Sequence, residues 1–134
     1  MSHTFSRACV VLVFLGCFLK PAYAQIDYNP KNPVFTAQVG DTARQSLGIY
    51  LTDNRILPQV PYTMRVTEST VSWLTHTAWP SGFTMTPNIG NFGINVFPAG
   101  LPAGRYTTSL TIYSGTNPAT SAIGTVNVTF IISA

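Results

Sequence analysis

The chain has 134 residues, of which 46% are hydrophobic and only 8% are charged, and its formal net charge is +3. A chain of this length corresponds to one domain, and this composition can form a packed core. Disordered tails and basic nucleic-acid-binding arms are therefore excluded, because both need many charged and few apolar residues. The composition alone identifies no particular activity.

Residues 1–24 have the order of a secretory signal peptide. Arg7 precedes an apolar run over residues 8–19, and the small residues Ala22 and Ala24 predict cleavage after Ala24. The run has 12 residues, whereas a helix that crosses a bilayer needs about 20. We therefore expect a protein without a stable membrane span after processing.

Both cysteines, Cys9 and Cys17, lie in this N-terminal segment. Gly16 before Cys17 permits lipid modification at that cysteine, but the bulky Phe14 and Leu15 make the site a poor match to lipoprotein signals. The processed chain then has no cysteine, and its fold must be stabilised by its core rather than by disulfides. We expect a secreted or periplasmic protein, with a bacterial source as the default.

Removal of residues 1–24 leaves 110 residues with nearly balanced charges, a net of about +1. The five remaining basic side chains are isolated in the sequence: Lys31, Arg44, Arg55, Arg65 and Arg105. Nucleic-acid binding requires basic residues to cluster, so we expect no nucleic-acid partner.

The processed chain shows the alternation of apolar and polar residues that is typical of β strands. Residues 25–33 contain two prolines and predict an extended N-terminal segment ahead of the domain. Strands are then predicted, in chain order, at residues 35–39, 47–51, 62–66, 71–74, 83–85, 92–96, 106–112 and 126–132. Seven or eight short strands without a convincing helix predict an all-β, two-sheet antiparallel sandwich over residues 34–134.

Two aromatic residues are predicted to determine the fold. Tyr106 follows the loop over residues 101–105 and begins a strong strand, which is the pattern of a tyrosine corner. Trp73 alternates with Val71 and is predicted to lie in the core.

Four sequence motifs resemble the BACON-like group of bacterial immunoglobulin-like domains, and the similarity covers about residues 65–132. The motifs are Ser72-Trp73-Leu74, Ser81-Gly82, the segment 95–112 with Ala103-Gly104-Arg105-Tyr106, and the last-strand segment 124–130. The resemblance implies an immunoglobulin-like β-sandwich outside the cytoplasm with a carbohydrate-binding or adhesive role.

Few residues of the processed chain could take part in catalysis. His76 is its sole histidine, and the Gly-x-Ser-x-Gly pattern of a nucleophile elbow is absent. A carboxylate pair of Asp53 and Glu68 is conceivable for glycoside hydrolysis, but turn and solubilising roles explain these residues better. Calcium ligation by Asp41 or by Asp53 with Asn54 lacks the usual run of acidic residues. We expect no enzyme, no metal and no cofactor.

Exposed aromatic residues are the remaining candidates for ligand contact, because sugar rings stack on aromatic faces. Trp79 precedes a predicted turn and is the first candidate, and Tyr50 and Tyr113 are predicted on the polar faces of their strands. The first hypothesis is therefore an exported, non-catalytic binding or adhesion module for a glycan or a protein partner, with carbohydrate as the favoured ligand.

The alternative hypothesis is a structural subunit of an extracellular or periplasmic assembly. The processed chain has 17 threonines, many at outward strand positions, and such an uncharged surface also suits stacking against copies of itself. The extended segment over residues 25–33 would then complete a neighbour's sheet by strand addition.

Overall fold

The computed structural model describes residues 26–55 and 60–134. The predicted signal peptide, its cleavage residues Ala22 and Ala24, and Cys17 lie outside the described residues. No helix in the described part of the chain is long and apolar enough to cross a membrane.

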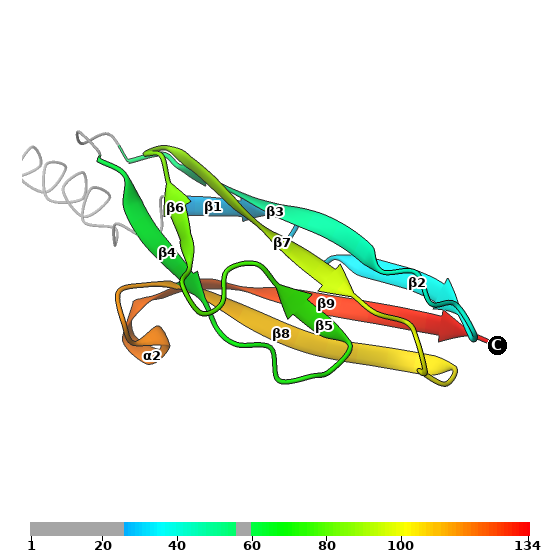
Figure 1. Cartoon of the computed structure of the whole chain (residues 1–134). Coiled ribbons are helices and arrows are strands. Elements are labelled where there is room, and N and C mark those ends of the chain that lie inside the picture. The colour runs from blue at the N-terminus through cyan, green and yellow to red at the C-terminus, as the bar shows by residue number, and fades with distance from the viewer. Residues whose placement is uncertain (1–25, 56–59) are drawn as a thin grey trace, which may run out of the picture.

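Two β-sheets face each other and form the sandwich (Figure 1). The four-stranded sheet has the order β1 (Ile26–Asn29), β3 (Gln45–Asp53), β7 (Ile89–Val96) and β5 (Leu74–His76). The five-stranded sheet has the order β2 (Val34–Gln38), β9 (Ala122–Ser133), β8 (Gly104–Ser114), β4 (Tyr62–Val66) and β6 (Phe83–Met85). Neighbouring strands are antiparallel except β2 and β9, which are parallel. The predicted all-β, two-sheet sandwich is confirmed, but it is not antiparallel throughout, because β2 and β9 pair in parallel.

The core lies between the two sheets and comes from the inward residues of each strand. Side chains in a strand alternate between the two faces of the sheet, so every second residue points to the interior, and these inward residues are mostly apolar. The largest fully buried side chains are Phe92, Phe130, Ile49, Leu51, Met64, Leu74, Met85, Ile94, Leu110 and Ile112. Burial of this apolar surface is the main stabilising contribution to the fold.

The N-terminal segment belongs to the sandwich, so the predicted domain boundary at residue 34 is wrong. Ile26–Asn29 forms β1 and pairs with β3. The backbone carbonyls of Lys31 and Pro33 then accept hydrogen bonds from β9 at 2.8 and 3.0 Å. The chain thus passes from one sheet to the other between β1 and β2, and the two prolines lie in that crossing.

Two local elements also differ from the sequence prediction. The strand predicted at residues 71–74 is instead β5, and Val71 lies in the preceding loop, where Ser69 Oγ donates to its carbonyl at 3.1 Å. A short helix, α2 (Pro118–Ser121), was not predicted. Its N-cap is Asn117, whose side chain accepts from the Ala119 N–H at 2.9 Å.

The loop before β8 contains a tyrosine corner. The Tyr106 hydroxyl donates to the Pro102 carbonyl at 2.6 Å. The Tyr106 ring meets Trp73 edge to face with 6.2 Å between centroids, and Trp73 lies 5.9 Å from the Phe130 ring. These contacts connect the corner to the buried core, because Trp73 and Phe130 are both buried.

Candidate functional site

The outer surface of β3 and β7 carries uncharged side chains. Outward residues of the two strands face each other in four pairs, namely Ser46 with Asn95, Gly48 with Gly93, Tyr50 with Asn91 and Thr52 with Ile89. We call these eight residues the outer face. The Ser46 hydroxyl donates to the Asn95 side-chain oxygen at 2.7 Å, which ties the two strands together at one end.

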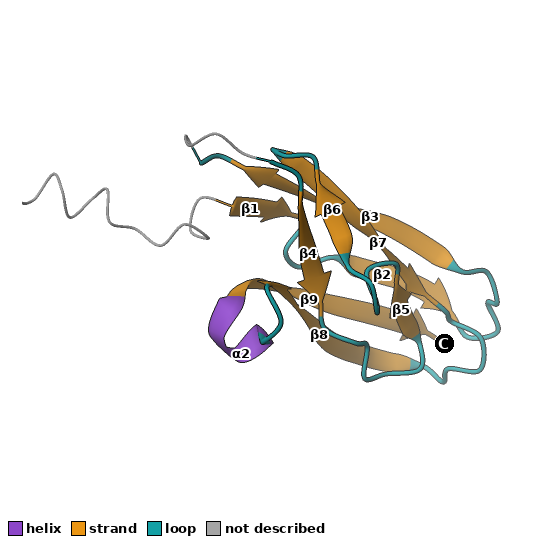
Figure 2. Ribbon diagram, turned by 60° about the vertical axis from the view of Figure 1, so that its left-hand side comes forward, coloured by secondary structure: helices purple, strands orange, loops and turns teal. Residues whose placement is uncertain are grey.

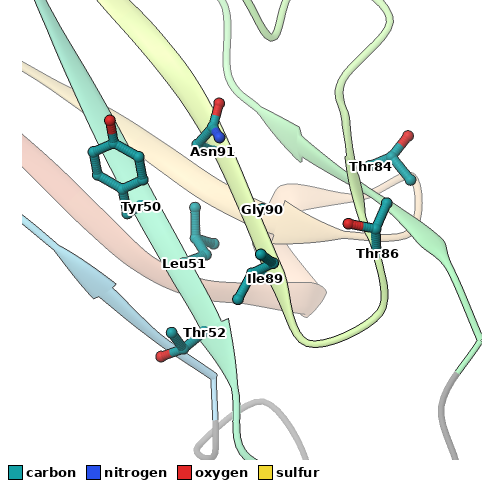
Figure 3. A pocket seen from close by; sticks show the side chains of 8 residues that line it. All are labelled: Tyr50, Leu51, Thr52, Thr84, Thr86, Ile89, Gly90 and Asn91. Atoms are coloured by element: carbon teal, nitrogen blue, oxygen red, sulfur yellow. The ribbon is translucent and has the colours of Figure 1, made fainter.

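Tyr50 is the aromatic residue of the outer face, and 63% of its surface is exposed. Its ring extends back along β3 from its own Cα (Figure 3). A Cβ placed on Gly48 would lie 3.0–3.1 Å from the ring, so the ring lies close over that glycine. The absence of a side chain at position 48 therefore lets the Tyr50 ring lie against the sheet with its other face exposed to solvent.

A groove of about 480 Å³ adjoins Tyr50. Figure 3 shows Tyr50 and Asn91 on adjacent strands and Thr84 and Thr86 on the chain opposite them. Thr52 and Ile89 complete the exposed lining. Every lining residue is uncharged, so the groove offers hydroxyl and amide groups beside one aromatic ring.

Trp79 lies at a different groove, of about 350 Å³, beside the edge strand β5. The residue is 45% exposed. Glu68 and Thr75 also line this groove, and none of its residues lines the Tyr50 groove. The structure therefore separates the first two candidate aromatic residues into two sites.

The expectation that Tyr113 is an exposed ligand contact is wrong. Only 7% of Tyr113 is exposed. The ladder between β8 and β9 shifts register between Ile112 and Tyr113, which disturbs the simple alternation on which the prediction relied. Helix α2 packs against β8 at this end of the sandwich (Figure 2).

Asp53 is buried, and its carboxylate accepts a network of hydrogen bonds at the end of β3. The Arg55 guanidinium Nε donates to both carboxylate oxygens at 2.9 and 3.0 Å, and the Tyr62 hydroxyl donates to the same carboxylate. Burial alone would raise the pKa of Asp53, but these hydrogen bonds prevail and lower it to about 2. Burial and the hydrogen bond to Asp53 raise the pKa of Tyr62 to about 12.

His76 uses both ring nitrogens in backbone contacts. Nε2 lies 2.8 Å from the Thr67 carbonyl, and Nδ1 accepts from the Ala78 N–H at 3.1 Å. This pattern requires the neutral ring with its proton on Nε2. Burial lowers the pKa of His76, partly offset by the hydrogen bond to Thr67. His76 therefore fixes the loop ahead of β5 and is not arranged to act as a catalytic base.

The remaining acidic candidates do not converge on a metal or on one another. Asp41 accepts a hydrogen bond from the Gln38 N–H at 2.8 Å. Asp53 belongs to the network at the end of β3, whereas Glu68 lines the Trp79 groove. Within residues 26–55 and 60–134, no three His, Cys, Asp or Glu side chains form a group that could hold a metal ion.

Sequence reasoning missed most of the Tyr50 groove. The strand was predicted only from residue 92, but β7 begins at Ile89 and includes Asn91. Thr84 and Thr86 approach Tyr50 only because the chain around β6 adjoins β7. The one available signal was a glycine in each of two apolar strands, since Gly48 and Gly93 prove to be opposite each other.

Comparison with known proteins identifies the fold of this chain but does not assign the chain to a family. No protein-family model and no curated protein matches the chain. Among solved structures, the PapD-like domain 7 of human CEP192 is similar over 86% of this chain and 88% of that one, with 13% identity and a TM-score of 0.51. These values show an immunoglobulin-like, PapD-like sandwich fold.

Two larger proteins contain a similar domain. A family 123 glycoside hydrolase from Clostridium perfringens matches over 78% of this chain and 23% of its own, with 13% identity and a TM-score of 0.51. Tripeptidyl peptidase 2 matches over 84% of this chain and 10% of its own, with 12% identity and a TM-score of 0.54. The chain thus corresponds to a small part of each enzyme, and the likeness is one of fold alone.

Proposed function

We propose that the protein is an exported, non-catalytic binding module that recognises a neutral carbohydrate at the Tyr50 groove. The observation that carries this proposal is the Tyr50 ring, which lies over Gly48 with 63% of the residue exposed beside a groove of about 480 Å³. An aromatic ring fixed along a sheet offers a flat apolar surface to the C–H face of a sugar.

The polar neighbours of Tyr50 suit the hydroxyl groups of a sugar. Asn91 offers both an amide donor and a carbonyl acceptor, and Thr52, Thr84 and Thr86 offer hydroxyls that donate and accept. A groove with an apolar platform and a few polar groups is the usual composition of a small-molecule site. The BACON-like resemblance of residues 65–132 supports the same ligand class.

The charges around the groove favour a neutral ligand over an acidic one. The lining has no charged residue. Asp27 on the adjoining strand β1 is paired with Lys31 at 3.1 Å, so these two charges largely offset each other. Recognition of uronate or sulfate groups would need free arginine or lysine side chains at the site.

The edge of β2 argues against the alternative hypothesis of assembly by strand addition. The Thr36 carbonyl accepts from the Gln45 side chain at 2.7 Å, and the Gln38 N–H and carbonyl both bond to Asp41. Groups occupied in this way are not available to a strand from another molecule. The segment that was expected to act as the donor strand contributes β1 to its own sheet.

Binding to a panel of neutral and acidic oligosaccharides, measured by calorimetry, tests the proposal. We expect the parent protein to bind a neutral oligosaccharide. This binding should be lost in Tyr50→Ala and retained in Tyr50→Phe, because the phenyl ring preserves the flat apolar surface. Trp79→Ala is the matched control, since it removes an exposed aromatic residue at the other groove. Equal binding by Tyr50→Ala, or binding of acidic glycans alone, would refute the proposal.

A further inference from the structure

Tyr50 lies between two asparagines in one row across the four-stranded sheet. Asn29 of β1 and Asn91 of β7 are its direct partners on the two neighbouring strands. Directly opposite residues of antiparallel strands point to the same face of a sheet, so all three side chains lie on the outer side of the sandwich. Neighbouring strands lie about 4.8 Å apart, which places the backbones of the two asparagines about 10 Å from each other.

Both flanking amides are available to a ligand. Asn29 and Asn91 are exposed, and among the residues that the structure describes neither side chain has a hydrogen-bond partner. In contrast, Asn95, four residues further along β7, accepts from the Ser46 hydroxyl at 2.7 Å. Each of the two flanking amides offers a carbonyl acceptor and two N–H donors, which are the groups that bind sugar hydroxyls.

The outer face has room for several linked sugar units. Ser46 and Thr52 are six residues apart on β3, which corresponds to about 20 Å of extended strand. Gly48 and Gly93 face each other within this length, so neither strand places a side chain in that row. The Tyr50 ring points along β3 in the same direction (Figure 3). A linear glycan parallel to β3 would stack one unit on this ring and present one rim of the unit to each flanking asparagine.

Equatorial hydroxyl groups suit this arrangement. They project from the rim of a pyranose, close to the plane of its ring, and so toward side chains on either side of a stacked unit. An axial hydroxyl points to the aromatic ring or to solvent instead, away from the amides at the rim. In a β-1,4-linked chain the 2- and 3-hydroxyls lie at one rim of a unit and the 6-hydroxymethyl group lies at the other.

We infer that the Tyr50 site selects a β-1,4-linked glucan chain, and that Asn29 and Asn91 determine this specificity at the two rims of the unit stacked on Tyr50. One amide binds the equatorial 2-hydroxyl, and the other binds the 6-hydroxymethyl group; the direction of the glycan along β3 decides which. The selectivity rests on the proposed function, because it needs a neutral sugar on the Tyr50 ring. Asn29 is a new member of the site, since it lies across β3 from the groove.

Three trisaccharides of the same linkage and length test the inference by calorimetry. Cellotriose carries both features, β-1,4-mannotriose has an axial 2-hydroxyl, and β-1,4-xylotriose lacks the 6-hydroxymethyl group. We expect the parent protein to bind cellotriose about two- to tenfold more tightly than either analogue, because each analogue loses the equivalent of one hydrogen bond.

Alanine variants assign the two rims. One of Asn29→Ala and Asn91→Ala should bind cellotriose and mannotriose equally, and the other should bind cellotriose and xylotriose equally. Both should bind cellotriose about two- to tenfold more weakly than the parent. Asn127→Ala is the matched control and should bind like the parent, because it removes an exposed asparagine from β9 of the other sheet. Circular dichroism checks that each variant is folded.

The inference and the proposed function fail in different ways. Tyr50-dependent binding of neutral oligosaccharides without a preference for cellotriose would overturn the inference alone. Asn29→Ala with both preferences of the parent would do the same. A parent protein that binds no neutral oligosaccharide would overturn the proposed function and the inference together.

Discussion

The Tyr28 hydroxyl crosses the sandwich and exchanges two hydrogen bonds with the backbone of Thr125, accepting from its N–H at 2.9 Å and donating to its carbonyl at 3.0 Å. This contact joins β1 of one sheet to β9 of the other across 97 positions in the sequence. It requires Gly124, because a Cβ at that position would overlap the Tyr28 ring. A residue of the N-terminal segment thus helps to hold the two sheets together.

Substitution of Gly124 should therefore destabilise the protein. We expect Gly124→Ala to lower the free energy of unfolding by about 1–3 kcal/mol, the usual cost of overpacking a close contact. Urea unfolding followed by fluorescence measures this change. In the matched control Gly93→Ala the new Cβ would meet only Thr77, at 3.5 Å. A loss as large in Gly93→Ala as in Gly124→Ala would contradict the explanation, as would full additivity of Gly124→Ala with Tyr28→Ala.

The Asp53 network predicts a loss of stability in acid. The folded pKa of Asp53 is about 2, below its ordinary value of 3.8, so the unfolded chain takes up the proton first as the pH falls. The stabilisation is complete above about pH 5 and decreases as the pH falls through 3.8 towards 2. Chemical unfolding at a series of pH values should show this slope, and Asp53→Asn should remove most of it. Tyr62→Phe should retain the slope in weaker form, because Arg55 still binds the carboxylate.

His76 predicts a second, separate pH effect. Burial lowers its folded pKa below the ordinary value of 6.5, so the unfolded chain is protonated first as the pH falls through 6.5. The stabilisation is complete well above pH 6.5 and decreases between 6.5 and the lower folded pKa. NMR titration of the imidazole should give a midpoint below 6.5, with the proton on Nε2 above it. A midpoint at or above 6.5 would show that the ring is not held neutral by burial.

The tyrosine corner should contribute about 1 kcal/mol through its hydrogen bond. Tyr106→Phe removes the hydroxyl that donates to Pro102 but keeps the ring against Trp73. We expect a lower free energy of unfolding with unchanged near-ultraviolet circular dichroism, because the aromatic packing remains. A variant as stable as the parent would show that the corner does not stabilise this fold.

Local patterns predicted most of the strands but gave no prediction of which strands pair. The strand at residues 83–85 was placed correctly because Gly82 and Pro87 bound a clear alternation. β1 was missed because its four residues show little alternation and precede two prolines, and only pairing with β3 makes them a strand. Tyr113 was misassigned because a register shift follows Ile112, and such shifts depend on the partner strand.

For the candidate sites too, the local sequence predicted some features and not others. The exposure of Tyr50 and Trp79 was predicted from the sequence, because Tyr50 lies on the polar face of an alternating strand and Trp79 precedes a turn. The other residues that line each groove come from elsewhere in the fold. Asn91 lies beside Tyr50 through the β3–β7 register, and Glu68, in the loop ahead of β5, lines the same groove as Trp79. Long-range register is fixed by the complete core, and no short segment of sequence encodes it.

Substitution of Gly48 tests whether this glycine positions the Tyr50 ring for ligand binding. A Cβ there would lie 3.0–3.1 Å from the far end of the Tyr50 side chain, which can rotate away at little cost. We expect Gly48→Ala to leave the free energy of unfolding within about 1 kcal/mol of the parent, since alanine is otherwise favoured over glycine in a strand. The tilted ring should nevertheless weaken binding of a neutral oligosaccharide, as measured by calorimetry. Gly93→Ala, on the facing strand and clear of the ring, should weaken binding less, and the reverse order would show that Gly48 does not position Tyr50.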